Sequence, residues 1–290
     1  MAPQSNGQSV ICSLAIFNDK LYAGTQQTGR LFEWNDVDTW VQVAPQYNGV
    51  FAIPSLAVFN DKLYGSTING GLLLEWNGTD AWVEKAPQLN AQNETWSLVV
   101  FNDKLYAGTG TGGRLFEWNG TDAWAQKAPQ LDDEIYILSL IVFNDLLYAT
   151  TKHHGNLFQW NGTDAWVQKA PEFGGQQEMS NMVIYNDKIY AGTHPHGHLF
   201  EWNGIDAWAE KAPMLSSQIE IFSLIVYNDK IYGGTGLSGL LFEWNGTDAW
   251  VLKAGGLSGQ NRIWSLITYH QKLYAGTGNT GRLFQLHHWV

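Results

Sequence analysis

The chain alternates short apolar runs with polar, glycine-rich turns, and the pattern is clearest near residue 100. β-Branched and aromatic residues dominate these runs, which favours strands over helices. The first run, SLVVFN, has no polar alternation, as expected for a strand that is covered on both faces. Asn102–Asp103 predicts a turn after it, and Asn119–Gly120 predicts a two-residue hairpin between the third and fourth runs. The four predicted strands span 97–102, 104–109, 113–119 and 122–129.

This four-strand unit repeats along the whole chain. An aliphatic residue followed by tyrosine recurs every 42 residues without an insertion. Four antiparallel strands in each ~40–45 residues are the signature of a propeller blade. We therefore predict an all-β fold, a seven-bladed β-propeller that forms a single domain over residues 1–290. The seven pairs are Leu21–Tyr22, Leu63–Tyr64, Leu105–Tyr106, Leu147–Tyr148, Ile189–Tyr190, Ile231–Tyr232 and Leu273–Tyr274.

The two ends of the chain fall at nearly the same point of the repeat. Ala2–Pro3 matches Ala44–Pro45 one unit later, and Trp289–Val290 matches Trp250–Val251. A propeller with a gap would expose a strand edge. We predict that the ring closes in or beside the outermost strand of the last blade, with residues 1–3 extending that strand.

Strand direction divides the connections into two rims. In an antiparallel four-strand blade, the first–second and third–fourth connections lie at one end, which we call the constant rim because they read FNDK or YNDK and WNGTDAW in nearly every unit. The second–third turn and the link to the next blade lie at the other end, which we call the variable rim. Its seven turns read QQT, ING, GTG, KHH, HPH, GLS and GNT. We expect specificity on the variable rim.

Thirteen of the 15 tryptophans occupy two columns of the repeat. A large ring in every blade is expected to fill the space between neighbouring sheets or to cover the outer strands. The other two, Trp96 and Trp264, belong to two blades only. We interpret them, with Phe222 in the same column, as candidate ligand contacts; packing at the channel mouth is the alternative. Their counterparts in the other blades are Cys12, Pro54, Leu138 and Ser180.

A second column of candidates lies two residues earlier in the repeat. Blades three to seven have acidic, aromatic or basic residues there. Sugar rings offer apolar C–H faces that stack on aromatic side chains and hydroxyls that need polar partners, so such groups at a channel mouth suit a polyol. Ordinary solvated loop charges are the alternative. The column contains Glu94, Tyr136, Glu178, Glu220 and Arg262, and the predicted ligand-binding set is Trp96, Trp264, Phe222, Tyr136, Glu94, Glu178 and Glu220.

Five of the eight histidines lie in the variable turns of blades four and five. Alternate histidines on an extended segment point the same way, and imidazole nitrogens are common zinc ligands. We predict weak divalent-metal binding by His194, His196 and His153, and no other cofactor. A designed metal site is the alternative; weak or adventitious binding is favoured over it because Pro195 and Gly197 mark an ordinary turn. No general acid or base is evident, so we expect no catalysis.

The stretches LFEWNGTDAW and FNDKLYAGT resemble two propeller families. Kelch repeats have an aromatic residue, a tryptophan, a proline and a GG that ends the second strand; here YAGT stands in its place. Tectonin repeats, found in sugar-binding propellers, carry a YRWDG…W hairpin that is similar to LFEWNGTDAW, although they are usually shorter than 42 residues. The resemblance implies a propeller with a lectin-like or protein-interaction role.

Composition and charge narrow the choice of function. Hydrophobic residues make up 44% of the chain and charged residues 15%, as in a compact, turn-rich β protein. The net charge of −11 opposes nucleic-acid binding. No apolar run is long enough for membrane insertion, and the N-terminus has no signal-peptide pattern, so we expect the cytosol or export after removal of a leader. The single cysteine, Cys12, allows no intrachain disulfide.

The leading hypothesis is a monomeric, non-catalytic protein that binds carbohydrate through the variable rim. A kelch-type scaffold that binds a protein partner is the first alternative. A recently amplified or engineered ring without a fixed ligand, and a metal-assisted enzyme centred on the histidines, are the others.

Overall fold

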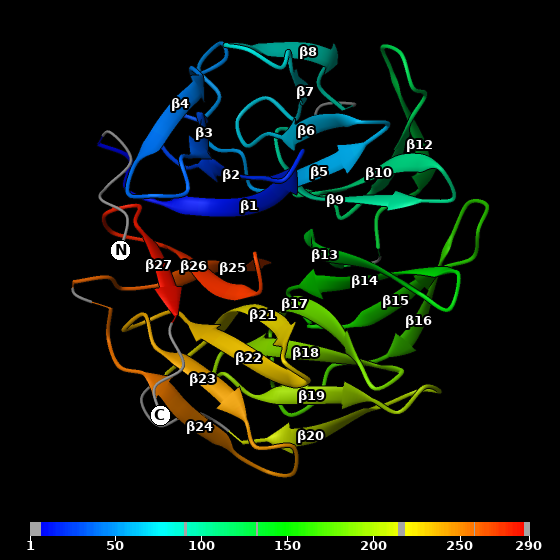
Figure 1. Cartoon of the computed structure of the whole chain (residues 1–290). Coiled ribbons are helices and arrows are strands. Elements are labelled where there is room, and N and C mark those ends of the chain that lie inside the picture. The colour runs from blue at the N-terminus through cyan, green and yellow to red at the C-terminus, as the bar shows by residue number, and fades with distance from the viewer. Residues whose placement is uncertain (1–6, 90–91, 132, 214–217, 258, 287–290) are drawn as a thin grey trace.

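The computed structural model describes residues 7–89, 92–131, 133–213, 218–257 and 259–286. Within these ranges the chain forms 27 strands in antiparallel sheets, and it contains no helix long and apolar enough to cross a bilayer. Each unit pairs its strands in chain order, so the chain is a seven-bladed, all-β propeller as predicted (Figure 1). One backbone pair, Lys152 with Glu178, joins blades four and five into an eight-stranded sheet.

The strands of the seven blades are as follows. Blade one has β1 (Ile11–Phe17), β2 (Lys20–Thr25), β3 (Leu31–Trp34) and β4 (Trp40–Ala44), and blade two has β5 (Leu56–Phe59), β6 (Lys62–Ser66), β7 (Leu73–Trp76) and β8 (Trp82–Ala86). Blade three has β9 (Thr95–Phe101), β10 (Lys104–Thr109), β11 (Leu115–Trp118) and β12 (Trp124–Ala128), and blade four has β13 (Tyr136–Phe143), β14 (Leu146–Lys152), β15 (Leu157–Trp160) and β16 (Trp166–Ala170). Blade five has β17 (Glu178–Tyr185), β18 (Lys188–His194), β19 (Leu199–Trp202) and β20 (Trp208–Ala212), and blade six has β21 (Ile221–Tyr227), β22 (Lys230–Thr235), β23 (Leu241–Trp244) and β24 (Trp250–Ala254). Blade seven has β25 (Ile263–Tyr269), β26 (Lys272–Thr277) and β27 (Leu283–Leu286).

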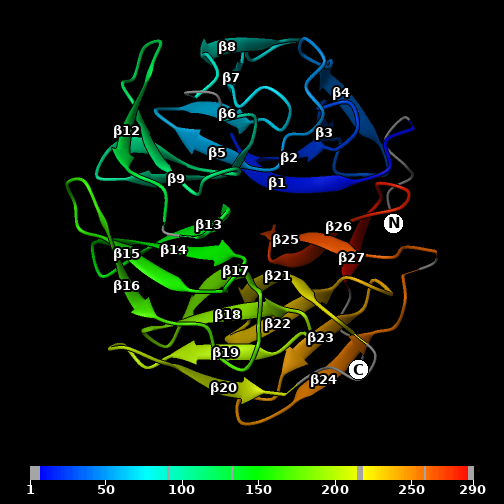
Figure 2. The ribbon, with the colours of Figure 1, turned by 180° about the vertical axis from the view of Figure 1, so that it is seen from behind.

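The first strands of the blades surround the centre of the ring, as both faces of the molecule show (Figures 1 and 2). Each contacts the first strand of the next blade, and β25 contacts β1, so the ring is closed. The Tyr269 hydroxyl reinforces the closure, because it lies 3.0 Å from the carbonyl oxygen of Asp19 and 2.8 Å from Oδ1 of Asp36 in blade one. The predicted outermost strand of the last blade, formed by residues 1–3 and Trp289–Val290, lies outside the described residues.

The predicted turn between the first two strands is confirmed. Asn102 and Asp103 connect β9 to β10 with φ angles of 47° and 56°. Asparagine and aspartate tolerate this left-handed region better than most residues, and two such residues match the right-handed twist of the flanking strands. The same pair of positive φ angles recurs in every blade, which explains why NDK is repeated.

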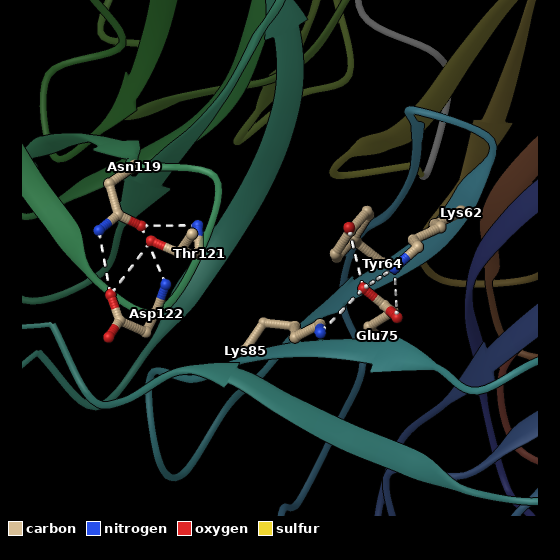
Figure 3. A network of polar contacts seen from close by, with 7 residues as sticks. All are labelled: Lys62, Tyr64, Glu75, Lys85, Asn119, Thr121 and Asp122. Atoms are coloured by element: carbon tan, nitrogen blue, oxygen red, sulfur yellow. Dashed lines mark hydrogen bonds and ion pairs between the residues drawn. The ribbon is translucent and has the colours of Figure 1, made fainter.

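The prediction of a two-residue hairpin at Asn119–Gly120 is wrong. Trp118 pairs with Trp124, so a five-residue loop joins β11 to β12. Oδ1 of Asn119 accepts hydrogen bonds from the backbone N–H groups of residues 121 and 122, at 2.9 and 3.0 Å (Figure 3). It also accepts one from the N–H group of residue 123, at 3.1 Å. An asparagine side chain that substitutes for backbone in this way stabilises a longer turn than the Asn-Gly dipeptide indicates.

A buried glutamate organises the constant-rim half of most blades. In blade two, Glu75 accepts hydrogen bonds from Tyr64 (3.0 Å) and Lys62 (3.0 Å), and Lys85 lies 3.5 Å away (Figure 3). Burial alone raises the pKa of Glu75, but the bonds from Lys62 and Tyr64 and the charge of Lys85 outweigh it and hold the pKa below its ordinary value. The equivalent glutamates of blades one, three, five and six make the same tyrosine and lysine contacts.

The two tryptophan columns pack the blades, as predicted for all members in the described residues; Trp289 lies outside them. The third-strand tryptophan contacts the second-strand tyrosine of the preceding blade. Ring centroids are 5.2 Å apart for Trp118 and Tyr64, and 5.4 Å apart for Trp160 and Tyr106. These tilted aromatic contacts bury large apolar area at the blade interfaces.

The prediction that the first strand is covered on both faces is wrong. Its residues alternate between buried and partly exposed, as in β1, where Ile16 is exposed between the buried Ala15 and Phe17. Val58, Val100 and Ile184 are exposed at the same position of the repeat. Because these strands surround the open centre of the ring, one set of side chains has no neighbouring sheet to cover it.

Candidate functional site

The candidate residues lie where the first strands begin at the variable rim. Tyr136 and Glu178 are the first residues of β13 and β17, and Glu94, Glu220 and Arg262 directly precede β9, β21 and β25. Trp96, Phe222 and Trp264 are the second residues of those three strands. All seven predicted ligand-binding residues therefore lie on one arc from blade three to blade seven, which we call the rim arc (Glu94, Trp96, Tyr136, Lys152, Glu178, His194, Glu220, Phe222, Arg262 and Trp264).

The opposite side of the rim arc is formed by the first residue of each second–third turn. Where that residue is glycine, the arc side chain lies directly above it. A Cβ atom added at Gly110 would lie 2.6 Å from Oε2 of Glu94, and one added at Gly236 would lie 2.6 Å from Oε2 of Glu220. Where the turn begins with Lys152 or His194, that side chain joins the arc. Lys152 was missed from the sequence, and His194 was identified only as a candidate metal ligand, although the alignment of both with the arc column could have revealed this role.

At blades three and four, the arc combines an acid with two aromatic rings. Nε1 of Trp96 donates a hydrogen bond to Oε2 of Glu94 at 2.8 Å. The ring of Tyr136 packs against Trp96 edge to face, with centroids 5.9 Å apart. Burial, with the charge of Glu94 as the next cause, raises the pKa of the Tyr136 hydroxyl, which therefore stays protonated at neutral pH.

At blades four and five, the charges are paired. Nζ of Lys152 lies 2.8 Å from Oε1 of Glu178 and 5.7 Å from the centre of the Tyr136 ring. Nδ1 of His194 lies 3.7 Å from the same Glu178 oxygen. Burial lowers the pKa of His194 and outweighs the opposing effect of Glu178, so the imidazole is neutral at neutral pH. This part of the arc crosses the blade boundary at the Lys152–Glu178 backbone pair.

At blades six and seven, a carboxyl group and a guanidinium group lie beside two aromatic rings. The rings of Phe222 and Trp264 have centroids 4.5 Å apart, and the guanidinium carbon of Arg262 lies 4.9 Å and 5.3 Å from their centres. Nε of Arg262 donates to the carbonyl oxygen of Gly236 at 3.3 Å. Such stacking holds a guanidinium in place without a carboxylate partner.

Glu220 is the most unusual group of the arc. It is only 7% exposed, and no donor among the described residues is within hydrogen-bonding or ion-pair distance of its carboxyl group. Burial raises its pKa to about 7, against the opposing charge of Arg262 and with a smaller contribution from Glu178. Buried polar groups are nearly always paired, so this carboxyl group requires an explanation.

The three histidines predicted to bind metal do not come together. His194 contacts Glu178, whereas Nδ1 of His153 lies 2.9 Å from Nε2 of its neighbour His154. His196 lies against His198, with ring centroids 6.2 Å apart. Across the described ranges, no group of three or more histidine, cysteine or acidic side chains could hold a metal ion. The metal site remains a prediction without geometric support.

A cavity of about 380 Å³ lies on the constant rim between blades three and four. It is lined in part by Lys104, Glu117 and Lys127, and it reaches Leu146, where the other blades have lysine. Lys104, Lys127 and the Tyr106 hydroxyl already meet at Glu117 in this cavity. Glu220 and Arg262 of the rim arc have no ion pair among the described residues, so the rim arc is the better candidate site.

No family model matches the chain, and no curated protein matches it. Solved structures do. A catalytically inactive variant of virginiamycin B lyase from Staphylococcus aureus with quinupristin has a TM-score of 0.80 at 7% identity, over 97% of this chain and 96% of that one. YCF48 bound to the D1 peptide has a TM-score of 0.73 at 14% identity, over 99% of this chain and 96% of that one.

An extracellular domain assigned to a hybrid two-component system of B. thetaiotaomicron has a TM-score of 0.78 at 16% identity. The match covers 98% of this chain, which spans 39% of the length of that domain. These likenesses show a β-propeller. At such low identities they establish the fold alone, and membership of the kelch or tectonin family remains a prediction.

Proposed function

We propose that this chain is a single-domain, non-catalytic binding propeller that takes a carbohydrate ligand on the rim arc. The observation that carries the proposal is the concentration of aromatic, acidic and basic side chains at one rim of blades three to seven. The repeat does not need these groups, because blades one and two have Val10, Cys12, Ala52 and Pro54 at the equivalent positions.

The chemistry of the arc suits a sugar. Trp96 and Tyr136 offer apolar ring surface beside the carboxylate of Glu94, and Phe222 and Trp264 offer it beside Glu220. Carboxylates accept hydrogen bonds from hydroxyl groups, and aromatic rings contact the C–H faces of a pyranose. Because the propeller carries two such clusters of aromatic and acidic side chains, one oligosaccharide could bind at both. Its overall affinity would then exceed the modest affinity of either cluster alone.

A glycan array tests this proposal, with the parent protein compared with Trp96→Ala and Trp264→Ala. We expect the parent to bind a defined set of glycans and each variant to lose at least tenfold in affinity for them, because each removes an aromatic surface. Val37→Ala, on an exposed loop of the constant rim, is the matched control and should bind like the parent. Absence of glycan binding by the folded parent contradicts the proposal.

A protein partner is the second candidate. Phe51, Ile135 and Ile219 are exposed in the links of the variable rim, at one position of the repeat in blades two, four and six. Exposed apolar residues at an otherwise polar rim are typical of interaction sites. YCF48, which shares the fold, is bound to a peptide. A protein ligand predicts that Phe51→Ser and Ile135→Ser abolish capture of that ligand while glycan binding is unchanged.

A further inference from the structure

The side chains of the rim arc at blades six and seven indicate which kind of sugar would bind there; this inference rests on the proposed carbohydrate-binding function. The starting point is Glu220. The residue as a whole is only 7% exposed, its carboxyl group has no hydrogen-bond donor among the described residues, and its Oε2 lies over the backbone of Gly236. An ionised carboxylate is costly in such a place unless a donor reaches it. A donor brought by the ligand would remove this cost.

Arg262 is the complementary group. Its Nε is bound to the carbonyl oxygen of Gly236, and its guanidinium lies against Phe222 and Trp264. Among the described residues no carboxylate lies within 4.0 Å of it, so its remaining N–H groups have no ionic partner. Glu220 and Arg262 influence each other electrostatically without forming an ion pair. One acceptor and one donor are therefore held beside the same aromatic pair.

We infer that blades six and seven form a subsite for one neutral sugar unit with neighbouring hydroxyl groups, in which Glu220 accepts a hydrogen bond from one hydroxyl and Arg262 donates to the next. Phe222 and Trp264 contact the apolar C–H groups of the same unit. A hydroxyl is both donor and acceptor, so a pair of them satisfies both side chains without adding charge.

The surrounding charges disfavour ionised sugars. A uronic carboxylate that reaches Arg262 would lie near the like charges of Glu220 and Glu178, and an ammonium group that reaches Glu220 would lie near those of Arg262 and Lys152. His194, the remaining titratable group near this part of the arc, is held neutral by burial and contributes little charge. Either ionised ligand would leave one member of the Glu220–Arg262 pair opposed by a like charge.

Binding at this subsite is linked to protons. In the free protein Glu220 has a pKa of about 7, so it is mostly protonated at pH 6 and mostly ionised at pH 8. A hydroxyl that donates to the carboxylate stabilises the ionised form and lowers the pKa, so the ligand displaces a proton. Affinity for a neutral sugar should therefore rise roughly tenfold between pH 6 and pH 8.

The test is NMR titration of the full chain at pH 6 and pH 8. The probes are methyl glycosides of the common neutral hexoses, with glucuronic acid and glucosamine as charged counterparts. We expect the neutral glycosides to bind best and to show the pH dependence. Glu220→Gln should lower the affinity at pH 8 at least tenfold and abolish the pH dependence. Glu84→Gln, at an exposed position of β8 outside the rim arc, is the matched control and should retain both the affinity and the pH dependence.

The outcomes separate this inference from the proposed function. If glycans bind and Trp96→Ala abolishes binding, but Glu220→Gln and Arg262→Gln leave affinity and pH profile unchanged, the subsite lies elsewhere and only this inference is wrong. Tighter binding of either charged sugar than of the neutral glycosides also overturns it. If no sugar binds the folded parent, the proposed function and this inference fall together. Thermal unfolding of each variant confirms that a loss of binding is not a loss of fold.

Discussion

The constant and variable rims are built by the two ends of the same strands, yet their charged side chains are paired in different ways. On the constant rim, a third-strand glutamate is satisfied within its own blade by a tyrosine and a lysine, as Glu117 is by Tyr106 and Lys104. On the variable rim, charges meet across blade boundaries, as Lys152 and Glu178 do, or have no ion-pair partner among the described residues, as is the case for Glu220 and Arg262.

This difference separates structural from functional polar residues. A polar group that its own repeat unit satisfies contributes to the stability of the blade and recurs in most copies. A polar group that no neighbour satisfies has a cost in the free protein and is explained by what binds there. Two blades depart from the constant-rim network: blade four has Leu146 and Gln159 in place of the lysine and the glutamate, and blade seven keeps Lys272 but has Gln285 in place of the glutamate.

The largest effect is expected where the repeated packing is removed. Trp118 is buried against Tyr64 and Phe59 of the preceding blade. Trp118→Ala should lower the free energy of unfolding by about 3–5 kcal/mol, because it leaves a cavity at a blade interface. Trp264→Ala, at the variable rim, should cost less than half as much because its ring is only partly buried. Denaturant unfolding measures both; equal costs would remove the distinction between the two tryptophan classes.

A smaller effect is expected from the constant-rim network. Glu117→Gln leaves Lys104 and Lys127 without their carboxylate and should cost about 1.5–3 kcal/mol at pH 7. Burial raises the pKa of Glu117, but the bonds from Tyr106 and Lys104 outweigh it and lower the pKa. Its contribution is therefore present above the ordinary glutamate pKa and is lost as the pH falls through the lower folded value.

A double variant gives this prediction its control. Lys104→Leu together with Glu117→Gln copies the pair that blade four already has at Leu146 and Gln159. We expect the double variant to cost less than Glu117→Gln alone, because only Lys127, and no longer Lys104 as well, then loses its carboxylate partner. If the unfolding free energy lost in the double variant equals the sum of the losses in Lys104→Leu and Glu117→Gln, the two residues are not coupled. Blade four would then not explain how a blade tolerates their replacement.

Most of the fold could be predicted because the chain repeats it. Seven copies of the same apolar and polar pattern identify the strands, and the Asn102–Asp103 turn follows from local backbone preference. The loop at Asn119 was misjudged because a side chain replaces backbone as the hydrogen-bond acceptor, which a dipeptide rule does not include. The exposure of Ile16 follows from the open centre of the ring, which no single blade determines.

The sequence was enough to predict which repeat positions carry the candidate site, but not which side chains contact one another there. Trp96 and Trp264 differ from their counterparts in other blades, and comparison of the units within the chain is enough to find them. The Lys152–Glu178 pair could not be found in this way, because it joins the turn of one blade to the first strand of the next. The stacking of Arg262 on Phe222 and Trp264 likewise depends on how far two neighbouring blades are offset.

The smallest predicted change in stability concerns Glu220 on the variable rim. Because burial raises the pKa of Glu220 to about 7, the folded state binds this proton more tightly than the unfolded chain does. Stability therefore falls as the pH rises from the ordinary glutamate value towards 7, since the buried carboxylate must then be ionised. Glu220→Gln removes this cost and should stabilise the protein by roughly 1–2 kcal/mol at pH 8, with no gain at pH 4.

Thermal or denaturant unfolding at the two pH values measures the effect. Glu117→Gln provides the opposite case, because that variant should destabilise the fold at pH 8 and lose its effect at low pH. Opposite signs for two glutamate-to-glutamine changes on opposite rims would support the division between satisfied and unsatisfied acids. Destabilisation by Glu220→Gln at pH 8 would mean that the free protein already satisfies this carboxylate, and the physical reason for placing a ligand there would be lost.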